Sequence, residues 1–114
     1  MRIGKVIQDF HAEYPDHVIL IAGITLTPID KESEWPGWVW CVHESGVECW
    51  VPTAYLDQQG QAAVLVKDYN AKELSVTIGQ QVSIGTSVSG WYWCLDQAGE
   101  EGWVPQKNIE IIKG

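Results

Sequence analysis

An internal repeat limits the folds open to this 114-residue chain more than any other feature of its sequence. Residues 37–52 read GWVWCVHESGVECWVP and residues 90–105 read GWYWCLDQAGEEGWVP, so the second copy begins 53 positions after the first. A repeat of this kind predicts two similar units instead of one continuous core. We therefore expect two small domains, at residues 1–58 and 61–114, joined at the polar stretch DQQGQ (57–61).

The secondary structure predicted for both halves consists of short strands. Runs rich in Val, Ile, Thr and Trp alternate with Gly, Pro, Asp and Ser clusters, and no long segment keeps the helical period of about 3.6 residues. The pattern predicts an all-β chain, and five short strands per unit favour a small, partly open barrel. The strands expected in the first unit are 6–10, 17–22, 25–29, 38–43 and 48–52. Those expected in the second unit are 63–69, 74–78, 81–85, 91–96 and 101–105, followed by 107–112.

Charge excludes several classes of partner. The net charge is −8, from seven basic and fifteen acidic residues. Nucleic acids and anionic membranes bind surfaces dense in Lys and Arg, so the composition argues against both and favours a cationic partner. No apolar run approaches the roughly 20 residues of a membrane span, and Gln8 and Asp9 interrupt the apolar start of the chain. We expect a soluble, cytoplasmic protein.

Cysteine and histidine in the first repeat raise the question of a metal or thiol site. Cys41, His43 and Cys49 lie close together in the sequence, but Asp96 and Gly102 stand where the second copy would need the last two. A zinc site needs three or four converging ligands, and a repeated site should repeat them. We therefore expect no metal and no cofactor. Because no Ser or Cys is paired with an oriented base, we also expect no enzymatic activity.

Several motifs follow one another in a characteristic order. In the second half they are Asp68-Tyr69-Asn70-Ala71, the stretch ELSVTIG (73–79), Gly90-Trp91-Tyr92 and the stretch GEEGWVP (99–105). In the first half they are Asp9-Phe10-His11-Ala12, Gly37-Trp38 and Trp50-Val51-Pro52 with Tyr55. In this order they resemble the Src-homology-3 (SH3) family, in its bacterial variant form. The resemblance implies two small five-stranded barrels in tandem.

The resemblance also implies a peptide site. Members of the family hold polyproline segments in a groove lined by aromatic side chains. In the first unit the implied peptide-binding residues are Phe10, Trp38, Trp50, Pro52 and Tyr55, beside the acidic Glu13, Asp16 and Glu34. The equivalent surface of the second unit is Tyr69, Trp91, Trp103 and Pro105, but Lys67 and Asn108 replace two groove tyrosines there. We therefore expect a non-enzymatic binding module whose first unit takes a basic, proline-containing peptide.

Two other roles stay open from the sequence. The aromatic surfaces could pack against each other within the tandem or across a homodimer, which would give a structural or assembly role. Cell-wall or glycan recognition is a further alternative, because bacterial relatives of this fold are often joined to wall-active enzymes. An exposed tryptophan on a hairpin is costly unless a partner covers it. If Trp38 is open to solvent, its surface is available to a ligand, and if the other unit or a second chain buries it, the role is one of assembly. The sequence leaves the exposure of Cys49 open.

Overall fold

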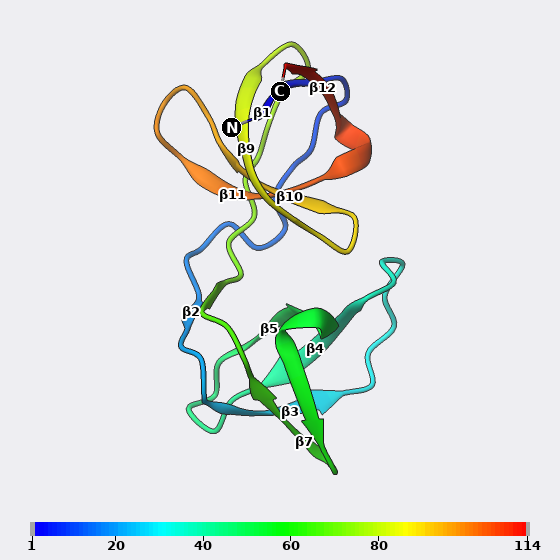
Figure 1. Cartoon of the computed structure of the whole chain (residues 1–114), viewed down its shortest axis with the longest axis vertical. Coiled ribbons are helices and arrows are strands. Elements are labelled where there is room, and N and C mark those ends of the chain that lie inside the picture. The colour runs from blue at the N-terminus through cyan, green and yellow to red at the C-terminus, as the bar shows by residue number, and fades with distance from the viewer. Residues whose placement is uncertain (1, 114) are drawn as a thin grey trace. The chain divides into compact units, whose positions relative to one another are not determined.

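The computed structural model describes residues 2–113 and confirms the all-β prediction (Figure 1). The strands of the first half are β1 (Arg2–Val6), β2 (Ile19–Leu20), β3 (Thr25–Ile29), β4 (Trp38–Val42), β5 (Glu48–Pro52) and β6 (Leu56–Gln59). Those of the second half are β7 (Ala62–Leu65), β8 (Tyr69–Asn70), β9 (Gln81–Val88), β10 (Trp91–Leu95), β11 (Glu101–Pro105) and β12 (Ile109–Lys113). Two short 3₁₀ helices, η1 (Thr53–Tyr55) and η2 (Gln106–Asn108), follow β5 and β11.

The chain forms two compact units, and their boundaries correct the predicted ones. Unit 1 consists of Met1–Asp16 together with Lys72–Gly114, and unit 2 consists of His17–Ala71. Each unit holds one five-stranded sheet. The contiguous domains expected at 1–58 and 61–114 therefore differ from the observed units, because the start of the chain lies in the unit built from its end.

The predicted linker is a β-hairpin. The polar stretch DQQGQ lies where β6 pairs antiparallel with β7, from Leu56↔Leu65 to Gln59↔Ala62. Gly60 has a φ of 69°, a conformation that glycine adopts readily in tight turns. Short polar sequences are typical of both linkers and hairpin turns, which is why composition did not distinguish them.

The sheet of unit 1 includes the amino-terminal strand. Its order is β11-β10-β9-β1-β12, so β1 lies between β9 and β12 (Figure 1). Val6 is paired with Ile109 of β12, and Gly4 with Val82 of β9. The strand predicted at 6–10 is thus displaced to Arg2–Val6. Beyond it, Phe10 makes only an isolated bridge, to Val76.

The sheet of unit 2 is completed by a strand from the middle of the chain. Its order is β5-β4-β3-β7-β6, which places β7 between β3 and β6. Thr25 of β3 is paired with Val64 of β7. The short strands β2 and β8 form a separate two-stranded sheet in the same unit, where Leu20 is paired with Tyr69.

Two similar segments occupy equivalent places in the two units. Residues 6–12 read VIQDFHA and residues 65–71 read LVKDYNA. In unit 1 the Gly79 N–H donates to the Val6 carbonyl at 2.8 Å, and in unit 2 the Gly23 N–H donates to the Leu65 carbonyl at 2.7 Å. We call residues 2–12 and 62–71 the exchanged segments, because each completes the sheet whose remaining strands come from the other half of the chain.

The aspartates of the exchanged segments support this equivalence. Asp9 Oδ1 accepts the Ile78 N–H at 2.6 Å, and Asp68 Oδ1 accepts the Ala22 N–H at 2.8 Å. Each carboxylate thus ties its exchanged segment to a backbone amide of the strand-and-turn region that precedes β9 or β3. The same residue type makes the same bond in each unit, so the repeat extends to the polar contacts.

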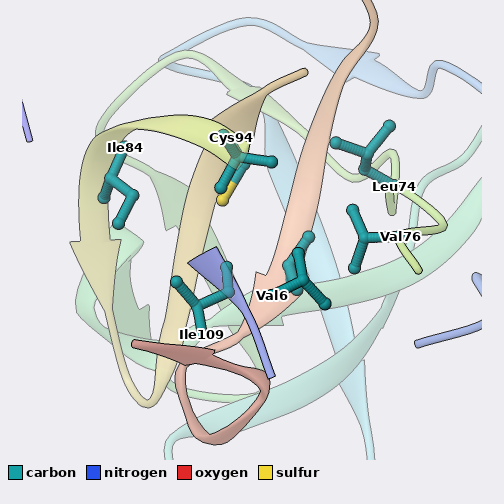
Figure 2. Packing of buried hydrophobic residues seen from close by; sticks show 8 residues of the cluster. Val6, Leu74, Val76, Ile84, Cys94 and Ile109 are labelled. Carbon is teal, nitrogen blue, oxygen red and sulfur yellow. The ribbon is translucent and has the colours of Figure 1, made fainter. Parts of the chain in front are cut away.

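The core of unit 1 depends on its exchanged segment. Val6 is fully buried and packs among side chains of the carboxyl-terminal half, including Leu74, Ile84 and Ile109 (Figure 2). Burying a valine or leucine side chain contributes about 1.5–3 kcal/mol. Leu65 of the other exchanged segment is likewise fully buried, in unit 2. Each unit therefore draws a central core side chain from the other half of the sequence.

Candidate peptide-binding surface

The two faces of the β4–β5 hairpin of unit 2 carry different side chains, because successive residues of a strand point to opposite faces. Cys41 and Cys49 are register partners and are 1% and 6% exposed, which settles the exposure of Cys49 as buried. Alternate positions on the two strands point to the opposite face of a sheet. The tryptophans at those positions, Trp38, Trp40 and Trp50, are half-buried. The outer face of this hairpin is therefore aromatic and partly accessible.

A pair of tyrosines lies in the same unit. Tyr55 of η1 and Tyr69 of β8 pack edge to face, with ring centroids 5.7 Å apart and an interplanar angle of 88°. The Tyr69 hydroxyl donates to the Trp50 carbonyl at 2.7 Å, which ties the ring to β5. Tyr55 and Tyr69 are 8% and 4% exposed, so this pair is largely covered.

Lys67 lies over Tyr55, one member of the tyrosine pair. Its Nζ is 5.1 Å from the centroid of the Tyr55 ring, within the range of a cation–π interaction. The sequence predicts Lys67 on the second surface, beside Trp91 and Asn108. The structure corrects that position, because Lys67 belongs to the exchanged segment that completes unit 2.

The exchange changes which predicted site residues come together. Trp38, Pro52 and Tyr55 lie in unit 2 as a set, and Tyr69 joins them there. Phe10, which the sequence groups with Trp38, lies in unit 1. The Phe10 ring packs edge-on against Trp91, with centroids 5.5 Å apart and an interplanar angle of 81°. Phe10 therefore lies in the unit of Trp91, and Tyr69 lies in the unit of Trp38, which is the reverse of the predicted grouping.

The corresponding surface of unit 1 is closed. Trp91 is 7% exposed, whereas its equivalent in unit 2, Trp38, is half-buried. Pro105 and its equivalent Pro52 are both less than 2% exposed, so the prolines do not distinguish the two surfaces. Asn108, where unit 2 has Tyr55, is 3% exposed. Its Nδ2 donates to the carbonyls of Gln8 and Asp9 at 3.2 and 3.0 Å, so the amide binds the exchanged segment instead of lining an open slot.

Trp103, predicted as part of the same surface, is also buried. It is 4% exposed and packs edge to face with Trp93, with ring centroids 5.3 Å apart. The pair repeats the Trp40–Trp50 pair of unit 2, whose centroids are 5.2 Å apart. The two pairs differ in accessibility, since Trp50 is half-buried where Trp103 is buried.

The predicted acidic residues divide between the units. Glu13 and Asp16 are exposed residues of unit 1, so they do not share a unit with Trp38. Glu34 lies in unit 2, in the exposed loop before β4 that also carries Asp30 and Glu32. Of the predicted acidic residues, only those of the loop before β4 therefore share a unit with Trp38.

A further carboxylate, Glu73, has a structural position in unit 1. Its Oε1 accepts the backbone N–H groups of Glu13 and Tyr14 at 2.8 and 3.3 Å. Burial raises the pKa of Glu73 above its usual value, the two hydrogen bonds oppose that shift, and the charge of Glu13 adds to it. These bonds hold the 13–14 turn against the strand-like segment that begins at Lys72.

Neither a cluster of potential metal ligands nor a helix able to span a membrane was found within residues 2–113. No three side chains of His, Cys, Asp or Glu in this range are grouped to hold a metal ion. His43 Nδ1 instead lies 2.8 Å from the Ser45 hydroxyl, in the hairpin turn. No helix of the described chain has the length and apolarity to cross a bilayer.

Lys31 was not predicted from the sequence to be a site residue. Lys31 Nζ lies 3.6 Å from the ring centroid of Trp40, on the outer face of the β4–β5 hairpin. The alternation of Trp38 and Trp40 along β4 was a signal that both tryptophans share this face. The position of Lys31 depends on the conformation of an irregular loop, for which the sequence carries no comparable signal.

Comparison with known proteins supports the resemblance for part of the chain. Residues 63–112 match the family described as variant SH3 domain. No curated protein and no solved structure matches the chain. The matched stretch crosses the boundary between the units, because 63–71 lies in unit 2 and 72–112 lies in unit 1. In the stretch that is similar to a variant SH3 domain, the first strand thus completes a different sheet from the remaining strands.

Proposed function

We propose that the chain is a non-enzymatic protein-interaction module and that unit 2 carries its peptide-binding surface. The observation that carries this proposal is the grouping of Trp38, Pro52, Tyr55 and Tyr69 in one unit. The variant SH3 match of residues 63–112 supports protein binding as the general class of function. The ligand class that this aromatic set favours is a polyproline segment, whose preformed conformation loses little entropy on binding.

The charge of unit 2 favours a basic ligand. Its sequence carries two basic residues, Lys31 and Lys67. Its acidic residues number seven: Asp30, Glu32, Glu34, Glu44, Glu48, Asp57 and Asp68. A basic residue flanking the prolines would gain long-range attraction to this unit and a screened ion pair with the loop before β4. Charge complementarity of this kind chiefly raises the association rate and the specificity.

Trp38 is the proposed first contact and the tyrosine pair the proposed floor. Trp38 is half-buried and adjoins the acidic loop, whereas Tyr55 is covered in part by Lys67. Displacing an exposed lysine side chain from an aromatic ring costs about 0.5–1 kcal/mol. The ligand would therefore replace Lys67 over Tyr55, and Lys67→Ala should bind the peptide more tightly than the wild-type chain.

For unit 1 we propose a supporting role. Its Trp91 and Asn108 are buried, and Asn108 hydrogen-bonds the backbone at Gln8 and Asp9. A side-chain amide that is used in this way offers no ring for a proline.

Isothermal titration calorimetry with peptides tests the proposal. A basic proline-rich peptide library should contain ligands whose affinity falls by roughly tenfold or more in Trp38→Ala, because an interface tryptophan is often a dominant contact. The matched control is Trp93→Ala, a half-buried tryptophan of unit 1, which should leave the affinity unchanged. Equal losses in the two folded variants, or an absence of binding throughout the library, would contradict the proposal.

A further inference from the structure

Trp40 and Trp50 form a half-buried corner on the outer face of the β4–β5 hairpin. They are register partners on adjacent strands, and their rings meet with centroids 5.2 Å apart at an interplanar angle of 77°. Two nearly perpendicular rings present two faces to the same space. We call this pair the tryptophan corner. Indole faces attract cations more strongly than the rings of Phe or Tyr do.

A cation of the chain itself already occupies the tryptophan corner. Lys31 Nζ lies 3.6 Å from the Trp40 centroid and 5.6 Å from the Trp50 centroid. Both distances fall within the roughly 6 Å range of cation–π attraction. The ammonium group therefore interacts with both rings at once, which is the arrangement that recognises alkylammonium ligands in aromatic cages.

A carboxylate flanks the tryptophan corner. Glu48 Oε1 accepts the indole N–H of Trp40 at 2.9 Å, which fixes the ring and brings a negative charge next to it. The charge of Glu48 therefore lies at the edge of the Trp40 ring, whose centroid is 3.6 Å from the Lys31 ammonium group. Ring quadrupoles and a carboxylate together select a positive group over a neutral one of the same size.

The distribution of lysines in unit 2 supports a preference for cations at its aromatic rings. Lys31 and Lys67 are its only Lys or Arg residues in the sequence, and both lie over aromatic rings. Lys31 also belongs to an exposed, irregular loop, so holding it in the corner restricts a flexible side chain. The ammonium group of a lysine on another molecule can therefore compete with Lys31 for the tryptophan corner.

We propose that Trp40, Trp50 and Glu48 bind the ammonium group of a lysine side chain, methylated or unmodified, on a partner protein. Lys31 acts as an internal substitute that occupies this site until the partner arrives. The inference goes beyond the proposed function, because the tryptophan corner includes neither Tyr55 nor Tyr69. It would hold even for a partner without proline.

Two-dimensional NMR of the indole N–H signals of Trp40 and Trp50 tests this inference. The probes are Nα-acetyl-lysine methylamide and its Nε-trimethyl form, and the neutral control is the Nε-acetyl form. Both charged probes should shift these two signals with saturation, and the neutral control should not. Equal shifts from the neutral control would overturn the inference, since the site would then bind the probes through apolar contact and not through their charge.

Removing the internal lysine provides the decisive comparison. Lys31→Ala should strengthen binding of the charged probes roughly two- to fivefold, the affinity equivalent of one exposed cation–π contact. Lys107→Ala makes the same charge change in unit 1 and should leave the affinity as it was. An unchanged affinity in Lys31→Ala would overturn the inference.

The same titration separates this site from the proposed peptide surface. Trp38→Ala should weaken a proline-rich peptide and leave the lysine probes bound at the tryptophan corner. Loss of the charged probes in Trp38→Ala, with folding retained, would contradict a separate lysine site. Failure of every proline-rich peptide to bind, with the charged probes still saturating Trp40 and Trp50, would reject the proposed function alone.

Discussion

At the scale of single residues, the three cysteines are packing side chains. Burial raises the pKa of Cys41 to about 11 and that of Cys94 to about 12. Burial, with Cys41 nearby, raises the pKa of Cys49 to about 12. The thiolate is the reactive form of cysteine, so these thiols are poor nucleophiles at neutral pH. They act as small hydrophobic groups in the two sheets.

The raised pKa values predict how stability changes in alkali. The folded chain holds these thiol protons more tightly than the unfolded chain, whose cysteines titrate near 9.0. The free energy of unfolding is therefore unaffected by these groups below pH 9 and falls as the pH rises from 9 toward 12. Each thiol contributes a slope of up to about 1.4 kcal/mol per pH unit in that window.

Urea unfolding of Cys94→Ala and the wild-type chain at several pH values measures this slope. The variant should start less stable at pH 8, because it loses a buried sulfur, and the difference should narrow as the pH rises above 9. A difference that stays constant across the window would show that Cys94 titrates alike in the folded and unfolded chains.

At the scale of elements, one close backbone contact holds a strand-like segment against β11. The Trp103 N–H donates to the Lys72 carbonyl at 2.9 Å, and the Leu74 N–H donates to the Trp103 carbonyl at 3.1 Å. Gly102 makes this approach possible. A Cβ at Gly102 would lie 2.7 Å from the Leu74 nitrogen and 2.8 Å from the Glu73 carbonyl carbon.

We predict that Gly102→Ala destabilises unit 1 by about 2–3 kcal/mol, because backbone atoms cannot move aside as a flexible side chain can. Gly85→Ala is the matched control within the same sheet. A Cβ at Gly85 would lie 3.6 Å from the Trp93 carbonyl oxygen, an ordinary contact, so the substitution should change stability by less than about 1 kcal/mol. Thermal unfolding of both variants checks the prediction, and equal melting temperatures would contradict it.

The elements also show what the sequence could and could not predict. The hairpins β4–β5 and β10–β11 agree with the predicted strands to within a residue, because alternation and turn residues are local signals. The partners of β1 and β7 were mispredicted. The exchanged segments are so similar, VIQDFHA against LVKDYNA, that either fits the same place in a sheet, and no local pattern chooses between them.

The candidate site divides in the same way. Trp38, Pro52 and Tyr55 were grouped from the sequence because they belong to one hairpin and the 3₁₀ helix after it, and they share unit 2. The choice between Phe10 and Tyr69 depends on long-range strand pairing and was not predictable from the repeat. The position of Lys31 depends on a loop without regular hydrogen bonding.

At the scale of the whole molecule, neither half of the sequence contains a complete unit. Unit 1 takes Val6 and Phe10 from the start of the chain, and unit 2 takes Leu65 and Tyr69 from beyond its middle. The chain passes between the units twice, after Asp16 and after Ala71. Tyr69 lies in the second half of the sequence, whereas Trp38, Pro52 and Tyr55 lie in the first half. The proposed peptide surface therefore combines residues from both halves.

Aromatic NOE contacts test the exchange of segments most directly. The structure predicts contacts between the rings of Phe10 and Trp91, whose centroids are 5.5 Å apart, and between those of Tyr55 and Tyr69, 5.7 Å apart. Two contiguous barrels would instead bring Phe10 to Tyr55 and Tyr69 to Trp91. Observation of the first pair of contacts supports the exchanged arrangement and the composite surface of unit 2, and observation of the second pair contradicts both.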